Sequence, residues 1–173
     1  SNDVTADLIE TSYRSFLTVF DEQLQRSRFL FGERPASSDF ALMGQLTCLA
    51  LFDPTPSAIT AERAPRVYAW TEVMEDLSGL EPEEGDWARA EALPDSFRGL
   101  LGEVGRFHVP FLLANAEALE RGAEQLEVEI AGRPWVQKPF PYQKKCLGWL
   151  RESHARLDAG ARRTVDGLLE GTG

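Results

Sequence analysis

Apolar side chains recur every three or four positions along most of the chain, a spacing typical of amphipathic helices. The helices predicted from this pattern cover residues 5–26, 66–77, 95–121, 146–157 and 159–169. Asp158 is expected to cap the last of them. Pro110 lies inside the third helix and should kink it or split it in two. The pattern therefore predicts a mainly helical chain.

One more helix is predicted over residues 39–52, and it differs from the others because Asp39 is its only charged residue. A helix this apolar is expected in the middle of a helical domain, buried nearly all round. Gly32 can supply the turn that precedes it. Ser37 or Ser38 can cap its first free N–H groups, and the carboxylate of Asp39 can accept further N–H bonds in the first turn.

The connections between the helices are rich in proline, glycine and acidic residues. Two prolines within residues 53–56 predict a loop, and a short helical turn is expected over residues 58–63. Residues 78–93 are expected to form an irregular surface connection. Over residues 125–138 apolar residues alternate with charged ones, which predicts a β-hairpin that must lie against helices. Its glutamates and the basic residues of its second strand suit cross-strand pairing.

The segment FLFGERPASSDFAL, at residues 29–42, resembles the all-helical C-terminal domain of glutathione S-transferases. In that family the central helix opens with a Ser/Thr-x-x-Asp capping box, and Asp39 matches its buried aspartate. Ala36 stands where the family usually has Ser or Thr, so Ser37 is the candidate to supply the missing half of the cap. The resemblance covers residues 5–80 and is weaker beyond them.

The resemblance implies a mainly helical bundle like that domain, here with an appended β-hairpin and two C-terminal helices. We expect a single domain over residues 1–173, with a core bundle at about 5–122 and the extension at about 123–173. The thioredoxin-like N-terminal domain, which in this family binds glutathione and carries the activating Ser, Tyr or Cys, is not in the sequence. Ser1 and Asn2 look like a remnant of tag removal, so the chain is expected to be a fragment of a longer protein.

On this resemblance, the whole protein is expected to be a bacterial, cytoplasmic glutathione S-transferase-like protein, and a homodimer is compatible with it. Glutathione is the implied cosubstrate, and a small hydrophobic electrophile, held by an apolar wall of the helical domain, is the implied second substrate. This chain by itself is expected to hold no cofactor and to be catalytically silent, because no nucleophile has a base at a recognisable spacing. Two alternatives are a non-catalytic protein-interaction module, as in a translation elongation factor subunit, and a thiol reductase or dehalogenase of the same superfamily.

Glycines at positions 99, 102 and 105 recur on one side of the helix predicted over residues 95–121. Their simplest explanation is the close approach of a neighbouring helix. Alternatively, together with the bend at the proline, they open a ligand cleft. The candidate substrate-pocket residues are Tyr13, Phe107, Phe111 and Asn115. Asn115 needs a hydrogen-bond partner in its apolar surroundings, and Tyr13 equally fits a core position with its hydroxyl satisfied.

Composition narrows the classes of function. A hydrophobic content of 43%, with 4 Trp and 10 Phe, is typical of a folded globular domain. The sequence has no run of about eighteen apolar residues, which excludes a membrane-spanning helix. The formal net charge of -10 and the pI near 4.7 argue against nucleic-acid binding.

Local charge and the thiols add further expectations. Residues 81–86 are acidic, whereas the C-terminal part of the chain is rich in Lys and Arg. This asymmetry suits two ends of the fold meeting or a solvated face, with an anionic ligand or partner as the alternative. Cys48 and Cys146 show no paired pattern and fit a reducing cytoplasm, with Cys48 in the core and Cys146 structural unless its neighbouring lysines activate it. His108 and His154 lack metal-ligand spacing, so a zinc site is not supported.

Overall fold

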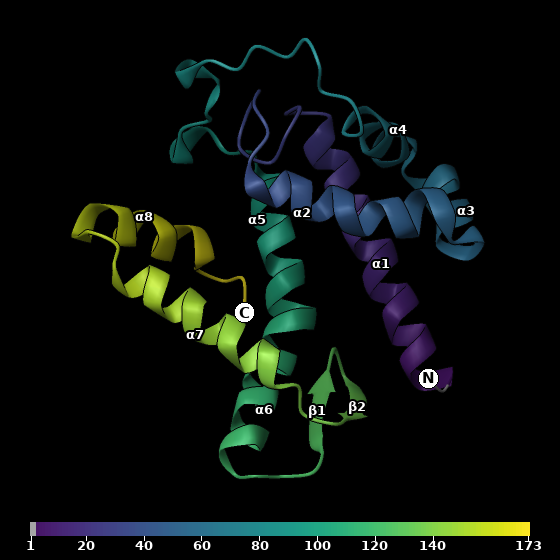
Figure 1. Ribbon diagram of the computed structural model, residues 1–173, viewed down its shortest axis with the longest axis vertical. Helices are drawn as coiled ribbons and strands as arrows, with labels where there is room; N and C mark the ends of the chain where they lie inside the picture. Colours follow the sequence, from purple (N-terminus) through teal and green to yellow (C-terminus); the bar gives the residue numbers. More distant parts are fainter. Residues whose placement is uncertain (1–2) are drawn as a thin grey trace. The chain divides into compact units, whose positions relative to one another are not determined.

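The structure, a computed structural model, describes residues 3–173 (Figure 1). Ser1 and Asn2, the expected remnant of tag removal, lie outside the described residues. Most of the described chain is helical and one two-stranded sheet accompanies the helices, as the sequence predicts. Within this range, no helix combines the length and the apolar character that spanning a membrane requires.

The described chain forms two compact units. One consists of Tyr13–Leu100, and the other combines the residues up to Ser12 with Leu101–Gly173. We call the second one the hairpin unit because it contains the sheet. This division differs from the predicted boundary near residue 122.

The Tyr13–Leu100 unit is built almost wholly from helices. Its elements are most of α1 (Asp3–Leu24), α2 (Ser37–Leu46), the π-helix η1 (Thr47–Phe52), α3 (Pro54–Arg63), α4 (Pro65–Val73), the short 3-10 helices η2 (Glu84–Asp86) and η3 (Ala90–Ala92), and the start of α5 (Asp95–Glu103). Its core includes an edge-to-face pair in which the ring centroids of Phe20 and Trp70 are 5.0 Å apart. The indole N–H of Trp70 donates to the carbonyl of Arg28 at 3.0 Å, so burial leaves this donor paired.

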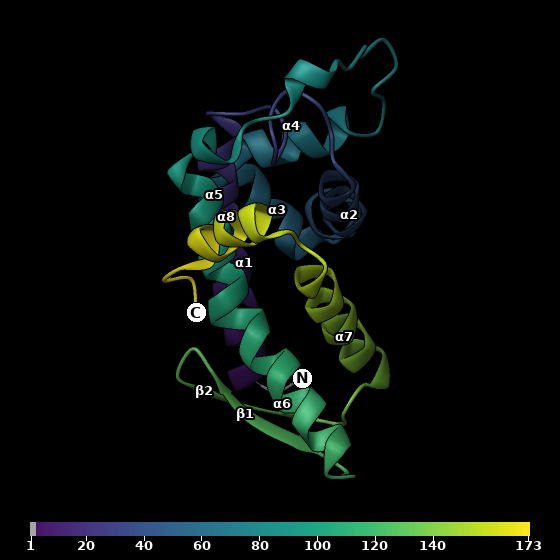
Figure 2. The ribbon, with the colours of Figure 1, turned by 90° about the vertical axis from the view of Figure 1, so that its left-hand side faces the viewer.

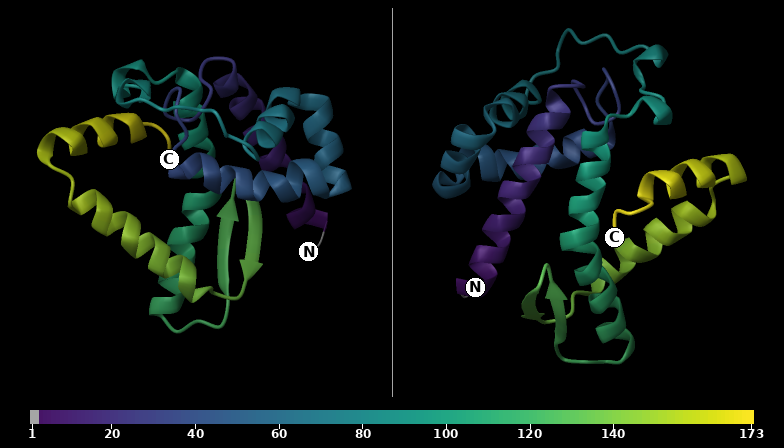
Figure 3. Two further views of the ribbon diagram at one scale, coloured as in Figure 1. Left: turned by 45° about the horizontal axis from the view of Figure 1, so that its top comes forward. Right: turned by 180° about the vertical axis from the view of Figure 1, so that it is seen from behind.

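The hairpin unit combines the start of α1 with the second part of the chain. Its elements are the end of α5, the π-helix η4 (Val104–His108), α6 (Val109–Glu120), β1 (Leu126–Ile130), β2 (Arg133–Gln137), α7 (Pro141–Ala155) and α8 (Ala159–Leu169). Figure 2 shows the hairpin against α6, and Figure 3 shows α8 turning back from the end of α7. The predicted cap of α8 is confirmed, because a carboxylate oxygen of Asp158 accepts the N–H groups of Gly160 at 2.7 Å and Ala161 at 2.9 Å.

The predicted β-hairpin is also confirmed. β1 and β2 pair antiparallel, with Ile130 opposite Arg133 beside the turn. Ala131 and Gly132 have positive φ values of 49° and 77°, which suit the tight two-residue turns whose twist matches that of paired strands. Arg133 does not find its partner across the hairpin as expected, because it forms an ion pair with Asp7 of α1.

Of two helix boundaries near prolines, one differs from the prediction and one agrees with it. The loop expected over residues 53–56 is wrong, because α3 begins at Pro54, where a missing N–H costs no intrahelical bond. Asp53 caps this helix by accepting the N–H of Thr55 at 3.2 Å. The split predicted at Pro110 in the long helix over residues 95–121 is confirmed, because η4 separates α5 from α6.

The apolar helix expected over residues 39–52 corresponds to α2 followed by η1. Only one side of it is covered, with Asp39, Leu46 and Ala50 buried. The expectation that it is buried nearly all round is therefore wrong. A helix without charged residues can be buried on all sides. Which of its sides are buried depends on the elements that pack against it.

The uncovered side of α2 and η1 is apolar. It carries Phe40, Leu49 and Phe52, with exposed fractions of 51%, 37% and 87%, and we call these three residues the exposed apolar stripe. Cys48 is also exposed, so its expected place in the core is wrong. Cys146, the second free thiol, is partly exposed on α7.

Gly32 forms the turn that leads into α2. Its φ of 123° lies in a region that side chains disfavour. Its carbonyl accepts the N–H of Phe29 at 3.0 Å. A Cβ at this position would collide with the backbone of Asp86 and Ala88. Glycine is needed here both for its backbone conformation and for its lack of a side chain.

Gly32→Ala is expected to lower the free energy of unfolding by about 1–3 kcal/mol, because the methyl group adds backbone strain and a collision. Gly44→Ala is the matched control, since Gly44 lies inside α2 with open space around it. Alanine there should raise stability by about 0.5–1 kcal/mol. Chemical denaturation measures both changes, and a Gly32→Ala variant as stable as the unmodified chain would contradict the geometry of this turn.

Candidate functional site

Asp39 is a fully buried carboxylate that joins the turn around Gly32 to the start of α2. One carboxylate oxygen accepts the N–H of Leu30 at 2.9 Å, and the other accepts the N–H of Ala36 at 2.9 Å. Burial raises the pKa of Asp39 above its ordinary value of 3.8, and the backbone N–H bonds offset part of this rise. The side chain thus satisfies one buried and one partly buried donor, which lie on either side of the turn.

The N-cap residue of α2 is Ala36, which has no side-chain acceptor. Ser37 is the first residue of the helix, is exposed and supplies no cap bond. Ser37 therefore does not take over the missing half of the capping box, and Asp39 forms its half alone.

Asp39→Ala is expected to destabilise the protein by about 1–3 kcal/mol, because a buried N–H group and a partly buried one lose their acceptor. Ser37→Ala is the control, and it should change stability by less than about 0.5 kcal/mol because no cap bond is lost. Thermal unfolding of the two variants provides the measurement. An unchanged melting temperature for Asp39→Ala would show that water or the relaxed backbone replaces the carboxylate.

A cleft of about 250 Å³ lies within the hairpin unit. Its walls come from the first turns of α1, from η4 and the start of α6, and from the hairpin. They are mainly apolar and aromatic. The lining residues are Leu8, Ile9, Ser12, Phe107, His108, Phe111, Ile130, Trp135 and Gln137.

The π-helix η4 and the proline that follows it shape one wall of the cleft. Pro110 has no N–H with which to continue the α-helical ladder, and its ring crowds the carbonyl four residues earlier. The helix widens here, and the N–H of Val109 bonds to the carbonyl of Val104. Phe107 and His108 lie in the widened turn and Phe111 follows it. π-helical turns are rare and are frequently found at functional sites.

The hairpin supplies another wall through its register. Trp135 lies opposite Val128 and Gln137 lies opposite Leu126, so the two β2 side chains share a face with the apolar residues of β1. The indole N–H of Trp135 donates to the side-chain oxygen of Gln137 at 2.9 Å. This bond holds the two lining side chains in one arrangement.

The model of the family described as "Glutathione S-transferase, C-terminal domain" matches residues 8–77. Residues 8–77 belong to this family. No curated protein and no solved structure matches the chain. The transferase domain so defined includes Asp39 with the whole of α2 and η1, and it ends after α4.

The cleft lies mostly beyond the transferase domain. Leu8, Ile9 and Ser12 belong to both, whereas the remaining six lining residues follow residue 77. The cleft is thus a product of the segment that the family match does not cover.

Two of the four candidate pocket residues, Phe107 and Phe111, line the cleft, and the other two do not. Asn115 is fully buried and holds the segment before α7 against α6. Its amide nitrogen donates to the carbonyl of Phe140 at 3.0 Å, and its oxygen accepts the N–H of the same residue at 2.7 Å. The backbone of Phe140 is thus the hydrogen-bond partner that Asn115 needs in its apolar surroundings.

Tyr13 lies in the Tyr13–Leu100 unit. Its hydroxyl is 2.6 Å from the hydroxyl of Thr60, and partial burial raises the pKa of Tyr13 above 10.0. Thr60 in turn donates to the carbonyl of Pro56 at 2.7 Å. Hydrogen bonding within the transferase domain therefore satisfies this hydroxyl.

The three glycines before the cleft have different surroundings. A Cβ at Gly99 would lie 2.8 Å from a methyl of Val19 on α1, which fits the expected close approach of a helix. A Cβ at Gly105 would collide with the backbone of Thr172 near the end of the chain, and Gly102 faces open space. Among these positions, only Gly99 is explained by a neighbouring helix.

His108 is the functional candidate that the sequence pattern does not single out. Within residues 3–173, no group of three or more His, Cys, Asp or Glu residues is placed to hold a metal. His108 lies three residues before Phe111, and this spacing indicates that both rings lie on the same side of a helix. Their ring centroids are 6.1 Å apart.

Burial of part of the ring lowers the pKa of His108 below its ordinary value of 6.5. The folded protein therefore binds this proton less tightly than the unfolded chain does, and acidification favours the unfolded chain. Relative to His108→Gln, the unmodified chain should lose stability as the pH falls from about 7.5 to about 5. Denaturation at a series of pH values measures this, and a stability difference that does not vary with pH would contradict it.

Proposed function

We propose that this chain is the helical part of a bacterial, cytoplasmic glutathione S-transferase-like protein. In this proposal a thioredoxin-like domain of the full-length protein binds glutathione and activates its thiol. The thiolate attacks a small apolar electrophile, forming a carbon–sulfur bond while the leaving group departs with the bonding electrons. The helical part provides the apolar site for that second substrate. The family match of residues 8–77 supports the proposal at the level of the domain.

The observation that carries the proposed substrate role is the aromatic cleft of the hairpin unit. Its volume of about 250 Å³ exceeds the ~150 Å³ that suffices to hold benzene in a protein interior. It lies just below the range of roughly 300–1,000 Å³ of most ligand sites. A molecule of one or two fused rings suits this size. Phe107, Phe111 and Trp135 offer such a molecule apolar ring surface.

Naphthalene is the probe that tests the cleft without glutathione. We expect it to bind the chain, and Phe111→Ala to weaken it by about 1–2 kcal/mol, roughly 5- to 30-fold, through lost apolar contact. Leu113→Ala is the control, because Leu113 lies on the same helix, is 46% exposed and does not line the cleft. Isothermal titration or a Trp fluorescence titration gives the dissociation constants.

If naphthalene does not bind, the aromatic residues of the cleft serve only to pack the hairpin against α6. Equal weakening by Phe111→Ala and Leu113→Ala would place the bound probe outside the cleft. Either result would remove the support that the cleft gives to the proposed substrate role.

A non-catalytic interaction module is the second candidate function. The exposed apolar stripe of Phe40, Leu49 and Phe52 favours it, because these three large apolar side chains are exposed along α2 and η1. The aromatic ring of Phe52 is the most exposed of the three, at 87%. If naphthalene fails to bind, this stripe becomes the strongest functional feature of the chain.

A further inference from the structure

Three of the nine residues that line the cleft are polar, and this chain itself engages two of them. The hydroxyl of Ser12 donates to the carbonyl of Ile9 at 2.8 Å. The side-chain oxygen of Gln137 accepts from Trp135 at 2.9 Å, and its nitrogen donates to the carbonyl of Lys138 at 3.3 Å. Ser12 and Gln137 are therefore already committed to partners within the protein.

His108 is the third polar residue of the cleft, and its situation differs. Within the described part of the chain its ring contacts Phe111 but forms no hydrogen bond. Partial burial of the ring lowers the pKa of His108, which favours the neutral imidazole. A neutral imidazole presents one N–H donor and one nitrogen acceptor. A ligand in the cleft thus meets one uncommitted hydrogen-bonding side chain among apolar walls.

The charge of the lining further restricts the ligand. No carboxylate, ammonium or guanidinium group belongs to the nine lining residues. Of the nearby basic residues, Arg106 lies over the ring of Phe107 at 4.8 Å from its centroid, and Arg133 is paired with Asp7. Neither a carboxylate nor a cation would find a compensating charge in the lining, so a neutral ligand is favoured.

We propose that the cleft selects neutral aromatic electrophiles with a single ring or two fused rings that also carry a hydroxyl or ring N–H group, and that His108 sets this preference. The inference rests on the proposed function, since it assumes that the same cleft takes the second substrate. His108 is exposed at the mouth of the cleft, so its ring nitrogens are hydrated in the free protein. A ligand with a hydroxyl or N–H group replaces that water with a hydrogen bond, whereas an analogue without such a group displaces the water and gives nothing in return. His108 is then the specificity-determining residue of the site.

Naphthalene and 2-naphthol form the matched pair of probes, because they share the two fused rings and differ by one hydroxyl group. We expect 2-naphthol to bind the unmodified chain about 3- to 10-fold more tightly than naphthalene. His108→Phe keeps an aromatic ring beside Phe111 and removes both nitrogens. It should bring the ratio of the two dissociation constants close to one while naphthalene binding is retained.

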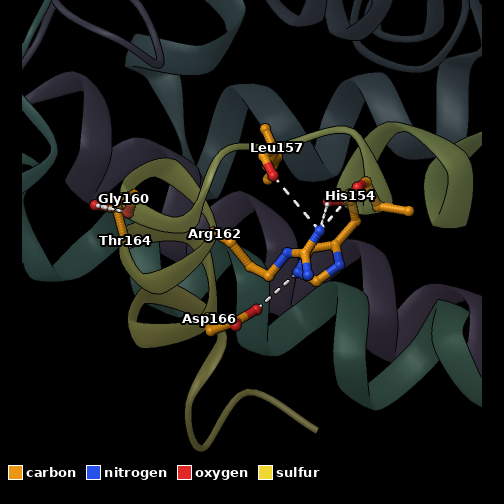
Figure 4. Close-up of polar contacts among 7 residues, drawn as sticks. His154, Leu157, Gly160, Arg162, Thr164 and Asp166 are labelled. Carbon is orange, nitrogen blue, oxygen red and sulfur yellow. Dashed lines mark hydrogen bonds and ion pairs between the residues drawn. The ribbon is translucent and has the colours of Figure 1, made fainter.

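The second histidine of the chain is an internal control. His154 lies at the end of α7, where its ring nitrogen is 2.7 Å from a carboxylate oxygen of Asp166 on α8 (Figure 4). Beside it, Arg162 donates to the carbonyls of Ala155 at 2.8 Å and Leu157 at 3.4 Å. The ring of His154 is therefore engaged by Asp166, and it does not line the cleft.

The chain has 2 histidines, so imidazole NMR resonances resolve the two sites in the unmodified protein. A His154→Asn variant assigns the signals. Addition of 2-naphthol should shift the resonances of His108 and leave those of His154 in place, whereas naphthalene should shift the nitrogen resonances of His108 much less. This measurement does not depend on the folding of His108→Phe.

Each outcome decides between the inference and the function on which it rests. If naphthalene binds and 2-naphthol binds no more tightly, the selection by His108 is overturned and the apolar site stands. If the preference for 2-naphthol persists in His108→Phe, or if His154 shifts in place of His108, another group is responsible and the inference is overturned. If neither probe binds, the inference and the substrate role of the cleft fall together.

Discussion

The buried carboxylate of Asp39 is the interaction on which the Tyr13–Leu100 unit depends. It accepts one N–H before the turn, from Leu30, and one after it, from Ala36. Because an unpaired buried donor costs about 1–3 kcal/mol, this carboxylate couples the turn to the N-cap residue of α2. α2 continues into η1, and η1 in turn lies against α3 and α4. One side chain thereby fixes where the central helix begins.

The two π-helices within residues 3–173 arise in the same way. Each π-helix ends two residues before a proline. In each, the N–H of the residue directly before the proline bonds to the carbonyl five residues earlier in the chain. In η1 this bond joins Asp53 to Cys48 at 2.8 Å before Pro54, and in η4 it joins Val109 to its partner before Pro110. The proline removes a ladder donor and crowds the preceding turn, and widening the helix accommodates both effects. After η1 the chain begins a new helix, whereas after η4 it continues in the same direction and frames the cleft.

The sequence predicts the local features of this fold well and the long-range ones poorly. Helical periodicity, strict alternation in the hairpin and the capping aspartates are properties of neighbouring residues, and the structure agrees with them. The fate of a polar side chain depends instead on what lies opposite it. Asn115 pairs with a residue 25 positions away and Tyr13 with one 47 positions away, so neither partner can be read from spacing. For the same reason the pattern could not reveal that His108 joins a cleft, or that Phe52 stays exposed.

The turn of the hairpin has a consequence for ligand choice, although neither of its residues lines the cleft. Side chains alternate between the two faces of a strand, so slipping one strand by one residue exchanges its faces completely. Ala131 and Gly132 fix the present alignment, in which Trp135 and Gln137 look toward the ligand space. Inserting or deleting a single residue in this turn would present Pro134 and Val136 there instead. A change in the length of this turn would thus alter the side chains that face a ligand in the cleft without altering any helix.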